Sequence, residues 1–561
     1  MYALVYAMLL AVGGTEISSE PGPRLAAMST GWLRIDGDLD VAVVCPPPLE
    51  DALKPWLEYR SRQGHSIAVI SNDATADSIK ARIRQCYEYH PNVSVVIIGD
   101  ANVNPVVGAR AATDGNCCVP THLAEAKVNV VFGSEPQIAT DNWYVDFDDD
   151  GVPEAPIGRL PVDSPTELAL VTKRIIDYER SPSFGPWRRR VNLIAGIGGF
   201  GVVADTAIES AAKTLLTRHL PPAYETTLTQ ASWQSPYCPG PPQFRNAVLG
   251  RFNEGALMWV YIGHGWRNEV DRVVAPDGLY PILAERDAQH LAAHPHPPLA
   301  VFLSCYSGAF DGPEDCLAES MLRQSGGPIA VLAGSRVTMP YAMSILGQEL
   351  MTAFFADEEA GVQSAPTLGQ IFRDAKRATA ERPRTSDEDK QFDALAKALM
   401  PMAADLDAQR REHLQLFNLL GDPLLRMPRP AKVEVQAPRE VRAGETIDVA
   451  AELPTAGRAT IELVVRRDRL VTAPEPREVY DLSPAGRQEF TSTYERANDT
   501  RLAVATFDAA AGRINPQVTV PSGIKGDCHV RVYVESQGGF AMGSADVKVL
   551  PARRTTAAAG P

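Results

Sequence analysis

The sequence predicts an α/β protein with a parallel sheet, followed by an all-β domain. Short apolar runs rich in β-branched residues alternate with stretches of helical periodicity, and this alternation is typical of a parallel sheet. The apolar runs lie at 41–44, 66–70 and 93–98, and the helical stretches at about 49–63 and 75–89. After Pro430 the period changes from helical to alternating, which favours a β-sandwich.

The α/β pattern is interrupted once and then restarts. A helix is expected over 165–180, and Pro-Ser-Phe-Gly-Pro at 182–186 then breaks the periodicity. A strand at 191–195 and a helix from about 206 to 219 open the second half. The strands that would complete a second sheet end at Ile262, Leu303 and Ala333. We therefore expect two α/β halves side by side.

Short strands separated by Gly/Pro turns fill the C-terminal part of the chain. They lie at 433–435, 447–449, 460–465, 502–506, 529–534 and 547–549. Such spacing is typical of an Ig-like β-sandwich, which we expect to support the α/β region. The predicted divisions are a leader or signal peptide at 1–30, α/β halves at 31–185 and 186–430, the β-sandwich at 431–550 and a disordered tail at 551–561.

Composition narrows the class of protein. The 561 residues correspond to about two to four domains, and 45% hydrophobic with 22% charged residues is ordinary for globular proteins. The net charge of −15 produces a surface that repels phosphate backbones, so nucleic acid is not an expected partner. The sequence has no apolar run of about 18 residues, so no transmembrane helix is predicted.

The N-terminus carries a short apolar run. Residues 1–14 resemble the hydrophobic region of a signal peptide, with small residues at 11–13 for cleavage, although the basic region before it is missing. A secreted or cell-envelope location follows from this interpretation. The alternative is a disordered or mis-started N-terminus. The 8 cysteines are scattered and predict neither a disulfide framework nor a CxxC metal site.

Two glycine-flanked motifs end two predicted strands with reactive side chains. Met258-Trp-Val-Tyr-Ile-Gly ends in His264-Gly265, and Leu299-Ala-Val-Phe-Leu-Ser ends in Cys305. Ligands of open α/β sheets bind beyond the carboxyl ends of the strands. A cysteine beside a histidine there can act as a nucleophile, because the imidazole generates the thiolate. Taken alone, each would more often be a buried core residue.

These motifs resemble the gingipain family of cysteine peptidases, relatives of the caspases. The resemblance covers roughly residues 40 to 430 in consistent order. Beyond the Gly-His-Gly and Ser-Cys motifs it is carried by 95–100 (VVIIGD), 156–161 (PIGRLP), 317–322 (LAESML), 326–335 (GGPIAVLAGS) and 417–423 (FNLLGDP). It implies a caspase-like three-layer α/β/α catalytic region of two subdomains. It also implies a cysteine endopeptidase that acts on proteins or peptides and needs no cofactor for catalysis.

The resemblance also implies roles for individual residues. Cys305 would attack the peptide, His264 would transfer protons, and the amides of Gly265 and Cys305 would form the oxyanion hole. Glu154 matches the position where the family places an acid against the histidine, which would orient the imidazole. The alternative for Glu154 is a solvated loop acid.

The loop before Glu154 matches the start of a calcium loop. Asp146, Asp148 and Asp150 have the D-x-D-x-D-G spacing, and Val152 can offer its carbonyl oxygen. Such dense carboxylates repel one another unless a cation or solvent screens them. We expect calcium in a structural role, ordering the loop that carries the predicted acid. The alternative is a plain acidic surface turn.

Substrate selection is predicted less directly. Asp163 and Glu167 follow the Gly158-Arg159 motif, near where gingipains form the pocket for the residue before the cleaved bond. A buried acid there would select arginine or lysine. Both acids can instead cap the helix that begins near Pro165.

Other motifs of the sequence suggest alternatives to a peptidase. Gly196-Ile-Gly-Gly-Phe-Gly201 fits the dinucleotide pattern, but no acid stands at the end of a following strand, so a strand-to-helix turn is expected. The histidines at 290, 294 and 296 favour a surface loop over a zinc site. The same catalytic residues would serve a sortase-like transpeptidase that processes exported proteins and associates with the cell envelope. A surface scaffold without catalysis is the non-enzymatic alternative.

Overall fold

A computed structural model describes most of the chain. The described residues are 25–28, 39–72, 75–101, 117–197, 219–356, 365–399, 405–467, 469–471, 474 and 476–553. The apolar run proposed as a signal sequence, the helix expected over 206–218 and the tail from 554 lie outside them. Residues 25–28, within the predicted leader, form the strand β1 at the edge of the main sheet.

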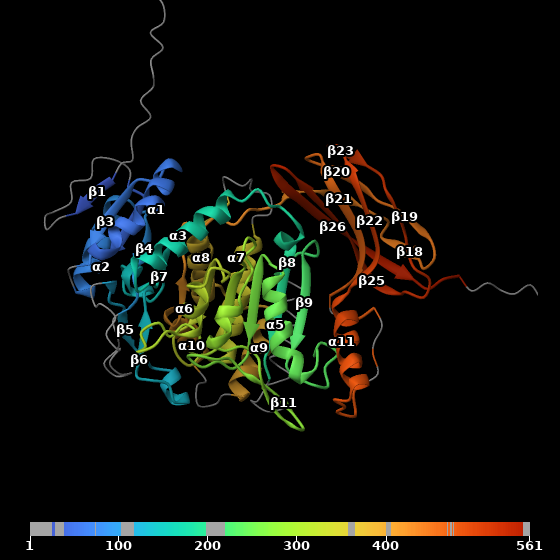
Figure 1. Cartoon of the computed structure of the whole chain (residues 1–561), viewed down its shortest axis with the longest axis horizontal. Coiled ribbons are helices and arrows are strands. Elements are labelled where there is room, and N and C mark those ends of the chain that lie inside the picture. The colour runs from blue at the N-terminus through green and yellow to red at the C-terminus, as the bar shows by residue number, and fades with distance from the viewer. Residues whose placement is uncertain are drawn as a thin grey trace, which may run out of the picture.

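A sheet of eleven described strands runs through the α/β region (Figure 1). In spatial order its strands are β1 (Leu25–Met28), β3 (Ile67–Ser71), β2 (Val41–Cys45), β4 (Ser94–Ile98), β7 (Ile157–Leu160), β15 (Phe417–Leu420), β14 (Ala330–Gly334), β13 (Leu299–Leu303), β10 (Met258–Ile262), β8 (Arg190–Ala195) and β9 (Glu225–Gln230). The expectation of two separate sheets is therefore wrong. The strand β15 joins the halves because it pairs with β7 on one side and β14 on the other.

The two halves of this sheet run in opposite directions. The strands from β1 to β15 are parallel to one another, and those from β14 to β9 are parallel to one another, while β14 and β15 are antiparallel. The residues that follow β10 and β13 therefore lie at the same edge as the residues that precede β7. Residues that follow β7 lie at the opposite edge.

Helices cover both faces of the sheet. One face packs against α1 (Glu50–Arg62), α3 (Pro165–Arg180), α7 (Pro340–Phe355) and α8 (Leu368–Glu381). The other packs against α2 (Ala76–Tyr89), α5 (Phe244–Asn253) and α6 (Leu317–Leu322). Alternation along a strand divides the cores: Val43 packs on the side of α1, and Val44 on the side of α2. The predicted caspase-like three-layer α/β/α architecture is confirmed.

Smaller elements complete the α/β region. Two hairpins are β5 (His122–Glu125) with β6 (Gln137–Thr140) and β11 (Arg272–Ala275) with β12 (Gly278–Pro281). Two further helices are α9 (Asp387–Leu399) and α10 (Leu406–Leu416). Short 3-10 turns are η1 (Pro47–Leu49), η3 (Asn129–Phe132), η4 (Asn142–Val145), η5 (Pro186–Arg189), η7 (Pro241–Gln243) and η8 (Glu285–His290).

The C-terminal domain consists of strands of 2 to 12 residues around its own apolar core. Its strands are β16 (Ala431–Lys432), β17 (Glu434–Gln436), β18 (Glu440–Arg442), β19 (Thr446–Asp448), β20 (Ala450–Leu453), β21 (Gly457–Val465), β22 (Arg501–Ala509), β23 (Gly512–Ile514), β24 (Gln517–Thr519), β25 (Gly526–Ser536) and β26 (Gly539–Leu550). The Ig-like assignment stays a prediction. The helix α11 (Pro484–Asn498) between β21 and β22 was not predicted, although Ser483 before Pro484 is a helix-start signal.

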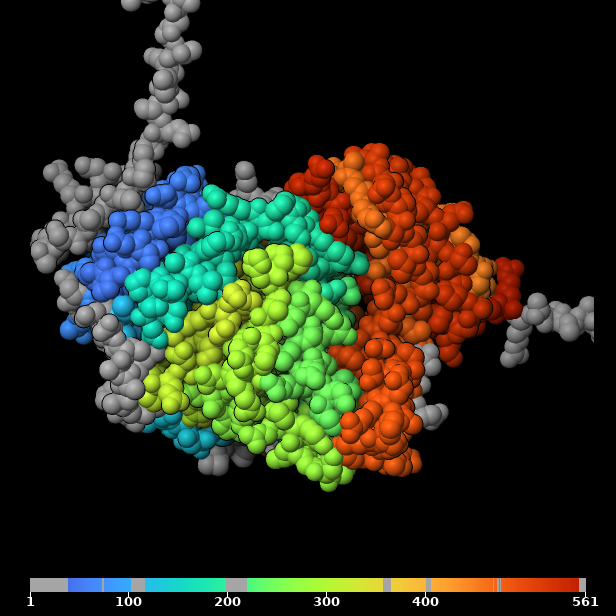
Figure 2. All heavy atoms as spheres, viewed as in Figure 1, coloured from blue at the N-terminus to red at the C-terminus, as the bar shows by residue number. Residues whose placement is uncertain are grey.

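This domain packs directly on the α/β region, as Figure 2 shows for the orange and red part of the surface. Glu462 of β21 accepts two hydrogen bonds from Arg189, both at 3.0 Å, and Arg531 lies 2.8 Å from the same carboxylate. All three side chains are buried. Because unpaired buried charges are costly, this triad favours one relative placement of the two regions.

Candidate active site

The strands β10 and β13 bring His264 and Cys305 to the same edge of the sheet. They are adjacent and parallel, and Ile262 pairs with Leu303 in register. His264 and Cys305 each stand two residues beyond that pair, and neighbouring strands lie roughly 5 Å apart. The N–H of Gly263 donates to the carbonyl of Leu303 at 3.2 Å, which continues the pairing past the strand ends. The predicted dyad is thus adjacent by register.

Gly265 packs closely against the backbone of Cys305. A Cβ atom at position 265 would lie 2.5 Å from the carbonyl oxygen of Cys305 and 2.9 Å from Cβ of Ser304. Real Cβ atoms do not approach that closely, so only glycine fits here without a shift of the backbone. The two chain segments that follow the strands therefore touch at the proposed reaction centre.

Thr338 supplies hydrogen-bonding groups to the Cys305 sulfur. Its backbone N–H donates to Sγ at 3.3 Å, and its hydroxyl oxygen lies 3.5 Å from the same atom. Thr338 follows β14, the next parallel strand after β13. Sequence reasoning missed this residue, because its position relative to Cys305 depends on the pairing of β13 with β14.

The residue after the cysteine turns the chain sharply. Tyr306 has a φ of 55°, which is uncommon for a residue other than glycine and costs on the order of 1 kcal/mol. Its N–H donates to the carbonyl of Arg336 at 3.1 Å, and its hydroxyl donates to Glu135 at 2.8 Å. Arg336 in turn forms a buried two-point ion pair with Asp311, at 2.8 and 2.5 Å. These contacts hold the segment that presents Cys305.

Exposure distinguishes Cys305 from the other cysteines. All 8 lie among the described residues, and Cys305 is half-buried while the other seven are buried. Burial raises the pKa of the Cys86, Cys238 and Cys528 thiols to about 11. Those three stay protonated at neutral pH and are poor nucleophiles.

An exposed tryptophan stands beside His264. Trp266 is 50% exposed, and its ring centroid lies 6.5 Å from that of His264. It begins the segment that leads to the β11–β12 hairpin, and its backbone N–H donates to the backbone carbonyl of Glu269 at 2.8 Å. Large exposed aromatics are common contact residues in binding sites. The sequence analysis did not single it out.

The acidic loop forms as predicted from its spacing. Oxygens of Asp146, Asp148, Asp150 and Glu154 all lie within 4.8 Å of one another. Asp146 accepts from Gly151 N–H at 3.0 Å. Asp150 accepts from the N–H of Val152 at 2.7 Å, and the role of the Val152 carbonyl stays a prediction.

The carboxylate of Glu154 belongs to this loop. It accepts a hydrogen bond from the N–H of Phe147 at 2.5 Å. Burial and the neighbouring aspartates raise the pKa of Glu154 above its ordinary value, and burial also raises that of Asp146. These contacts place Glu154 with the acidic cluster. Its predicted role in orienting His264 stays a prediction.

Asp163 and Glu167 have partners within the protein. Asp163 accepts from Arg323 at 2.7 Å, and Glu167 accepts from the N–H of Asp163 at 2.8 Å. Glu167 also stands in the first turn of α3, where Ser164 caps the helix. Both acids follow β7 and so lie toward the sheet edge opposite Cys305. The structure favours the capping alternative for Glu167, whereas Asp163 pairs with Arg323, and the selection of basic residues stays a prediction.

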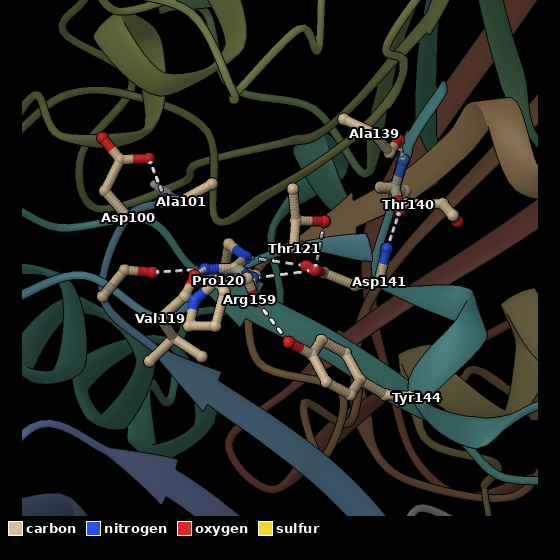
Figure 3. A network of polar contacts seen from close by, with 12 residues as sticks. Asp100, Ala101, Val119, Pro120, Thr121, Ala139, Thr140, Asp141, Tyr144 and Arg159 are labelled. Carbon is tan, nitrogen blue, oxygen red and sulfur yellow. Dashed lines mark hydrogen bonds and ion pairs between the residues drawn. The ribbon is translucent and has the colours of Figure 1, made fainter. Parts of the chain in front are cut away.

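Arg159 of the Gly-Arg motif is a buried structural residue (Figure 3). Its guanidinium donates to both carboxylate oxygens of Asp141 at 2.7 Å. It also donates to the carbonyls of Gly99 and Val119 at 2.9 and 3.0 Å, and Thr121 donates to Asp141 at 2.9 Å. The network ties β7 to the segments after β4 and β6.

Two weaker candidates have structural explanations. Gly196 follows β8, and its N–H donates to the carbonyl of Ile262 at 2.8 Å, while residues 198–201 of the glycine motif lie outside the described residues. His296 lies 2.9 Å from the Ser183 hydroxyl and stacks on Trp187.

Among the helices that the structure describes, none is long and apolar enough to cross a membrane.

A parallel-dominated sheet that presents a cysteine and a histidine on adjacent strand ends defines a cysteine peptidase architecture. Residues 34–428 match peptidase family C25. The chain therefore belongs to that family, the gingipain family, and is a cysteine-type peptidase. Cysteine peptidases hydrolyse peptides with protein groups alone, so catalysis requires no cofactor.

Solved structures agree on the fold. The chain is similar to the Arg-specific cysteine proteinase gingipain R, with a TM-score of 0.51 and 18% identity over 91% of this chain and 98% of that one. It is also similar to RgpB in a complex of its pro- and mature domains from Porphyromonas gingivalis, with a TM-score of 0.50 and 18% identity over 91% and 100%. Among curated proteins none matches this chain.

Proposed function

We propose that the chain is an endopeptidase in which Cys305 is the nucleophile and His264 transfers protons. The observation that carries this proposal is the register of β10 and β13, which sets the two residues side by side beyond paired strand ends. The half-buried position of Cys305 and the hydrogen bond that its sulfur accepts from Thr338 agree with a nucleophile that substrate can reach. The substrates are proteins or peptides.

Acylation begins with the thiolate of Cys305 attacking the carbonyl carbon of the scissile peptide. A carbon–sulfur bond forms and the carbonyl oxygen becomes an oxyanion. The amides of Gly265 and Cys305 are the proposed donors to this oxyanion, and one such donor is worth roughly 3 kcal/mol in known enzymes. The carbon–nitrogen bond then breaks as the His264 imidazolium gives its proton to the leaving amine.

Deacylation returns the enzyme to its starting state. His264, now neutral, takes a proton from a water molecule, which attacks the thioester carbon. The carbon–sulfur bond breaks, the carboxylic acid leaves and the thiolate–imidazolium pair is restored. An amine in place of water would give a new peptide bond, which is the transpeptidase alternative.

Cleavage of a mixed fluorogenic peptide library, combined with alkylation, tests the proposal. Peptides should be cut internally, and iodoacetamide should abolish cleavage while labelling Cys305 before the seven buried cysteines. Mass spectrometry of the products identifies the cut bonds and, with an added amine, any transferred product. No cleavage together with no preferential labelling of Cys305 would contradict the proposal and favour a non-catalytic scaffold.

The acidic loop is proposed to bind calcium in a structural role. Oxygen ligands from several carboxylates suit this hard cation. One oxygen of Asp146, a side chain only 7% exposed, is buried and has no hydrogen-bond partner among the described residues. Such an orphaned acceptor within a carboxylate cluster fits a cation ligand. The ion would be held by Asp146, Asp148, Asp150 and Glu154, with the Val152 carbonyl as a further ligand.

Removal of calcium is expected to lower the thermal stability of the protein. Without the cation the four carboxylates repel one another, and at a calcium concentration of 100 Kd binding contributes about 2.7 kcal/mol. The melting temperature should therefore rise with added calcium after treatment with a chelator. Asp148→Asn should weaken this response, whereas Asp177→Asn, an exposed acid on α3, should leave it unchanged. Equal melting temperatures with calcium and chelator would contradict the assignment.

A secreted or cell-envelope location remains a proposal. It is supported by the apolar N-terminal run and by the calcium loop, because millimolar calcium is available outside cells to sites of modest affinity. The two supports are independent of each other.

A further inference from the structure

Exposed apolar side chains gather on segments around the edge of the sheet that carries Cys305 and His264. Among the described residues nine large apolar side chains are exposed, and six of them lie on three such segments. These six are Val131, Phe132, Trp266, Val274, Leu279 and Val479. Single exposed apolar residues are ordinary on protein surfaces, but a group of them around one place marks a binding surface.

Trp266 lies on the histidine side of the site. Its half-exposed ring borders that of His264, with 6.5 Å between the ring centroids. The guanidinium of Arg267 donates to the carbonyl of Ala309, and the carbonyl of Arg267 accepts from the N–H of Leu317 at 2.7 Å. The turn that carries the indole is therefore tied to the segment that follows β13, so its backbone is held.

The β11–β12 hairpin extends this apolar surface. Val274 and Leu279 are paired across the two strands, so their side chains lie on the same face, and both are at least half exposed. The preceding residue, Val273, points the other way into the apolar core. The outer face of the hairpin is thus apolar, whereas the solvent face of an antiparallel pair is usually polar.

The C-terminal domain contacts the tip of the hairpin. The hydroxyls of Tyr280 on β12 and of Tyr480 in the segment before α11 donate to the two carboxylate oxygens of Asp277, each at 2.6 Å. Val479, next to Tyr480 in the chain, is 75% exposed. The C-terminal domain therefore helps to hold the hairpin in place and brings a further apolar side chain to its tip.

The turn η3 lies on the cysteine side of the site. Its residues Val131 and Phe132 are 44% and 40% exposed. Asn129, at the start of the turn, donates from its side-chain amide to the carbonyl of Val337 at 3.4 Å. Val337 directly precedes Thr338, whose N–H donates to the Cys305 sulfur. The turn is therefore anchored within two residues of a group that contacts the sulfur.

Both ends of η3 are fixed. The buried carboxylate of Glu412 accepts the backbone N–H groups of residues 127–129 at 2.6 to 2.8 Å. Beyond the turn, Glu135 accepts from the hydroxyl of Tyr306, the residue after Cys305. A fixed loop loses little conformational freedom when it binds a ligand, so Phe132 is presented in a form suited to binding.

Acids near this surface, or predicted to select basic residues, are already paired. Glu135 accepts from Tyr306 and lies 3.7 Å from Arg336. Asp163 and Glu167 lie toward the opposite edge of the sheet and have partners there. A substrate side chain beside the dyad therefore meets apolar groups on both the histidine and the cysteine side, and burial of apolar surface favours an apolar side chain.

We propose that Trp266 and Phe132 contact the substrate, and that the substrates carry apolar or aromatic side chains on both sides of the cleaved bond. This inference rests on the proposed function, because the occupant of a surface around the dyad is the peptide that the dyad cleaves. His264 protonates the leaving amine in that mechanism, so the chain after the cleaved bond passes nearest to Trp266. Phe132 is assigned to the residues before the bond.

The test is a fluorogenic peptide library in which the residues on each side of the cleaved bond are varied in turn. Peptides with phenylalanine or leucine there should be cleaved with a kcat/KM about 10-fold above those with serine or arginine, the scale of one aromatic contact. Trp266→Ala should raise KM about 10-fold for peptides with an aromatic residue after the bond. Phe132→Ala should do so for those with one before it.

The matched control is Val504→Ala, a valine 52% exposed on β22 of the C-terminal domain, which should leave KM unchanged. Thermal unfolding verifies that each variant folds. If Trp266→Ala also lowers kcat by disturbing His264, Phe132→Ala, which leaves the histidine side intact, decides the question. Unchanged KM in Phe132→Ala, or a preference for arginine with no preference for apolar residues, would overturn the inference.

A binding measurement separates this inference from the proposed function. Fluorescence anisotropy of labelled peptides, one with phenylalanine and one with serine on both sides of the bond, is followed with Cys305→Ala protein. The phenylalanine peptide should bind about 10-fold more tightly. Equal affinities would overturn the inference. Tighter binding of the phenylalanine peptide, together with no cleavage by the wild type, would overturn the proposed function and leave the apolar surface in place.

Discussion

Replacement of Cys305 by alanine is expected to abolish peptide cleavage, with kcat/KM falling by more than about 10⁴-fold. The acyl-enzyme route needs the sulfur, and no other described cysteine can replace it, since the seven others are buried. Burial also keeps several of them protonated, because it raises the pKa of Cys86 and Cys238 to about 11. Initial rates on a library peptide measure the effect.

Cys86→Ala is the matched control. Its thiol is buried on α2, in the apolar core between that helix and the first half of the sheet. This variant should therefore lose a small part of its stability and keep its activity. Circular dichroism of both variants verifies folding. Cleavage by Cys305→Ala at a rate close to that of the wild type would show that another residue is the nucleophile, and the assignment of the site would be wrong.

The placement of His264 and Cys305 at one edge of the sheet could be predicted because its determinants are local. The apolar runs 258–262 and 299–303 are short and include β-branched and aromatic residues, and each is followed by a glycine or serine before the reactive residue. Two such runs in a predicted parallel sheet end at the same edge. The structure adds their adjacency and register, which bring Gly265 onto the backbone of Cys305.

Residues that act across the fold could not be predicted in the same way. The backbone N–H of Asp271 bonds to the hydroxyl of Tyr261 because the chain folds back through the start of β11, and the Asp271 carboxylate accepts from Ile197, just beyond β8. Nothing in the spacing of 261 and 271 indicates this contact. Thr338 reaches the sulfur for a similar reason, since it follows a strand that pairs with β13.

The sequence did not predict a single sheet, because the joining of its two halves depends on one short strand. The run Phe417–Leu420 has four residues and lies far along the chain from β7, yet it pairs with both β7 and β14. Local periodicity cannot report the partner of so short a strand. The acidic loop, in contrast, is formed by residues within nine positions of one another, so its spacing alone predicted the cluster.

Removal of the Asp141 carboxylate is expected to destabilise the protein by about 3–5 kcal/mol, because Asp141→Ala leaves the Arg159 guanidinium buried without its counter-ion. Arg159 is fully buried, and both oxygens of Asp141 accept from it at 2.7 Å (Figure 3). The remaining acceptors are neutral carbonyls such as those of Gly99 and Val119, which cannot offset the charge. Urea denaturation followed by circular dichroism measures the loss.

The exposed pair of Lys173 with Asp177 on α3 provides the comparison. Both side chains reach solvent, so Asp177→Ala should change the unfolding free energy by less than about 1 kcal/mol. Burial, and not the presence of an ion pair, is what separates the two expectations. Equal losses in the two variants would mean that water reaches Arg159 after the substitution, and that the network does not hold β7 as its geometry indicates.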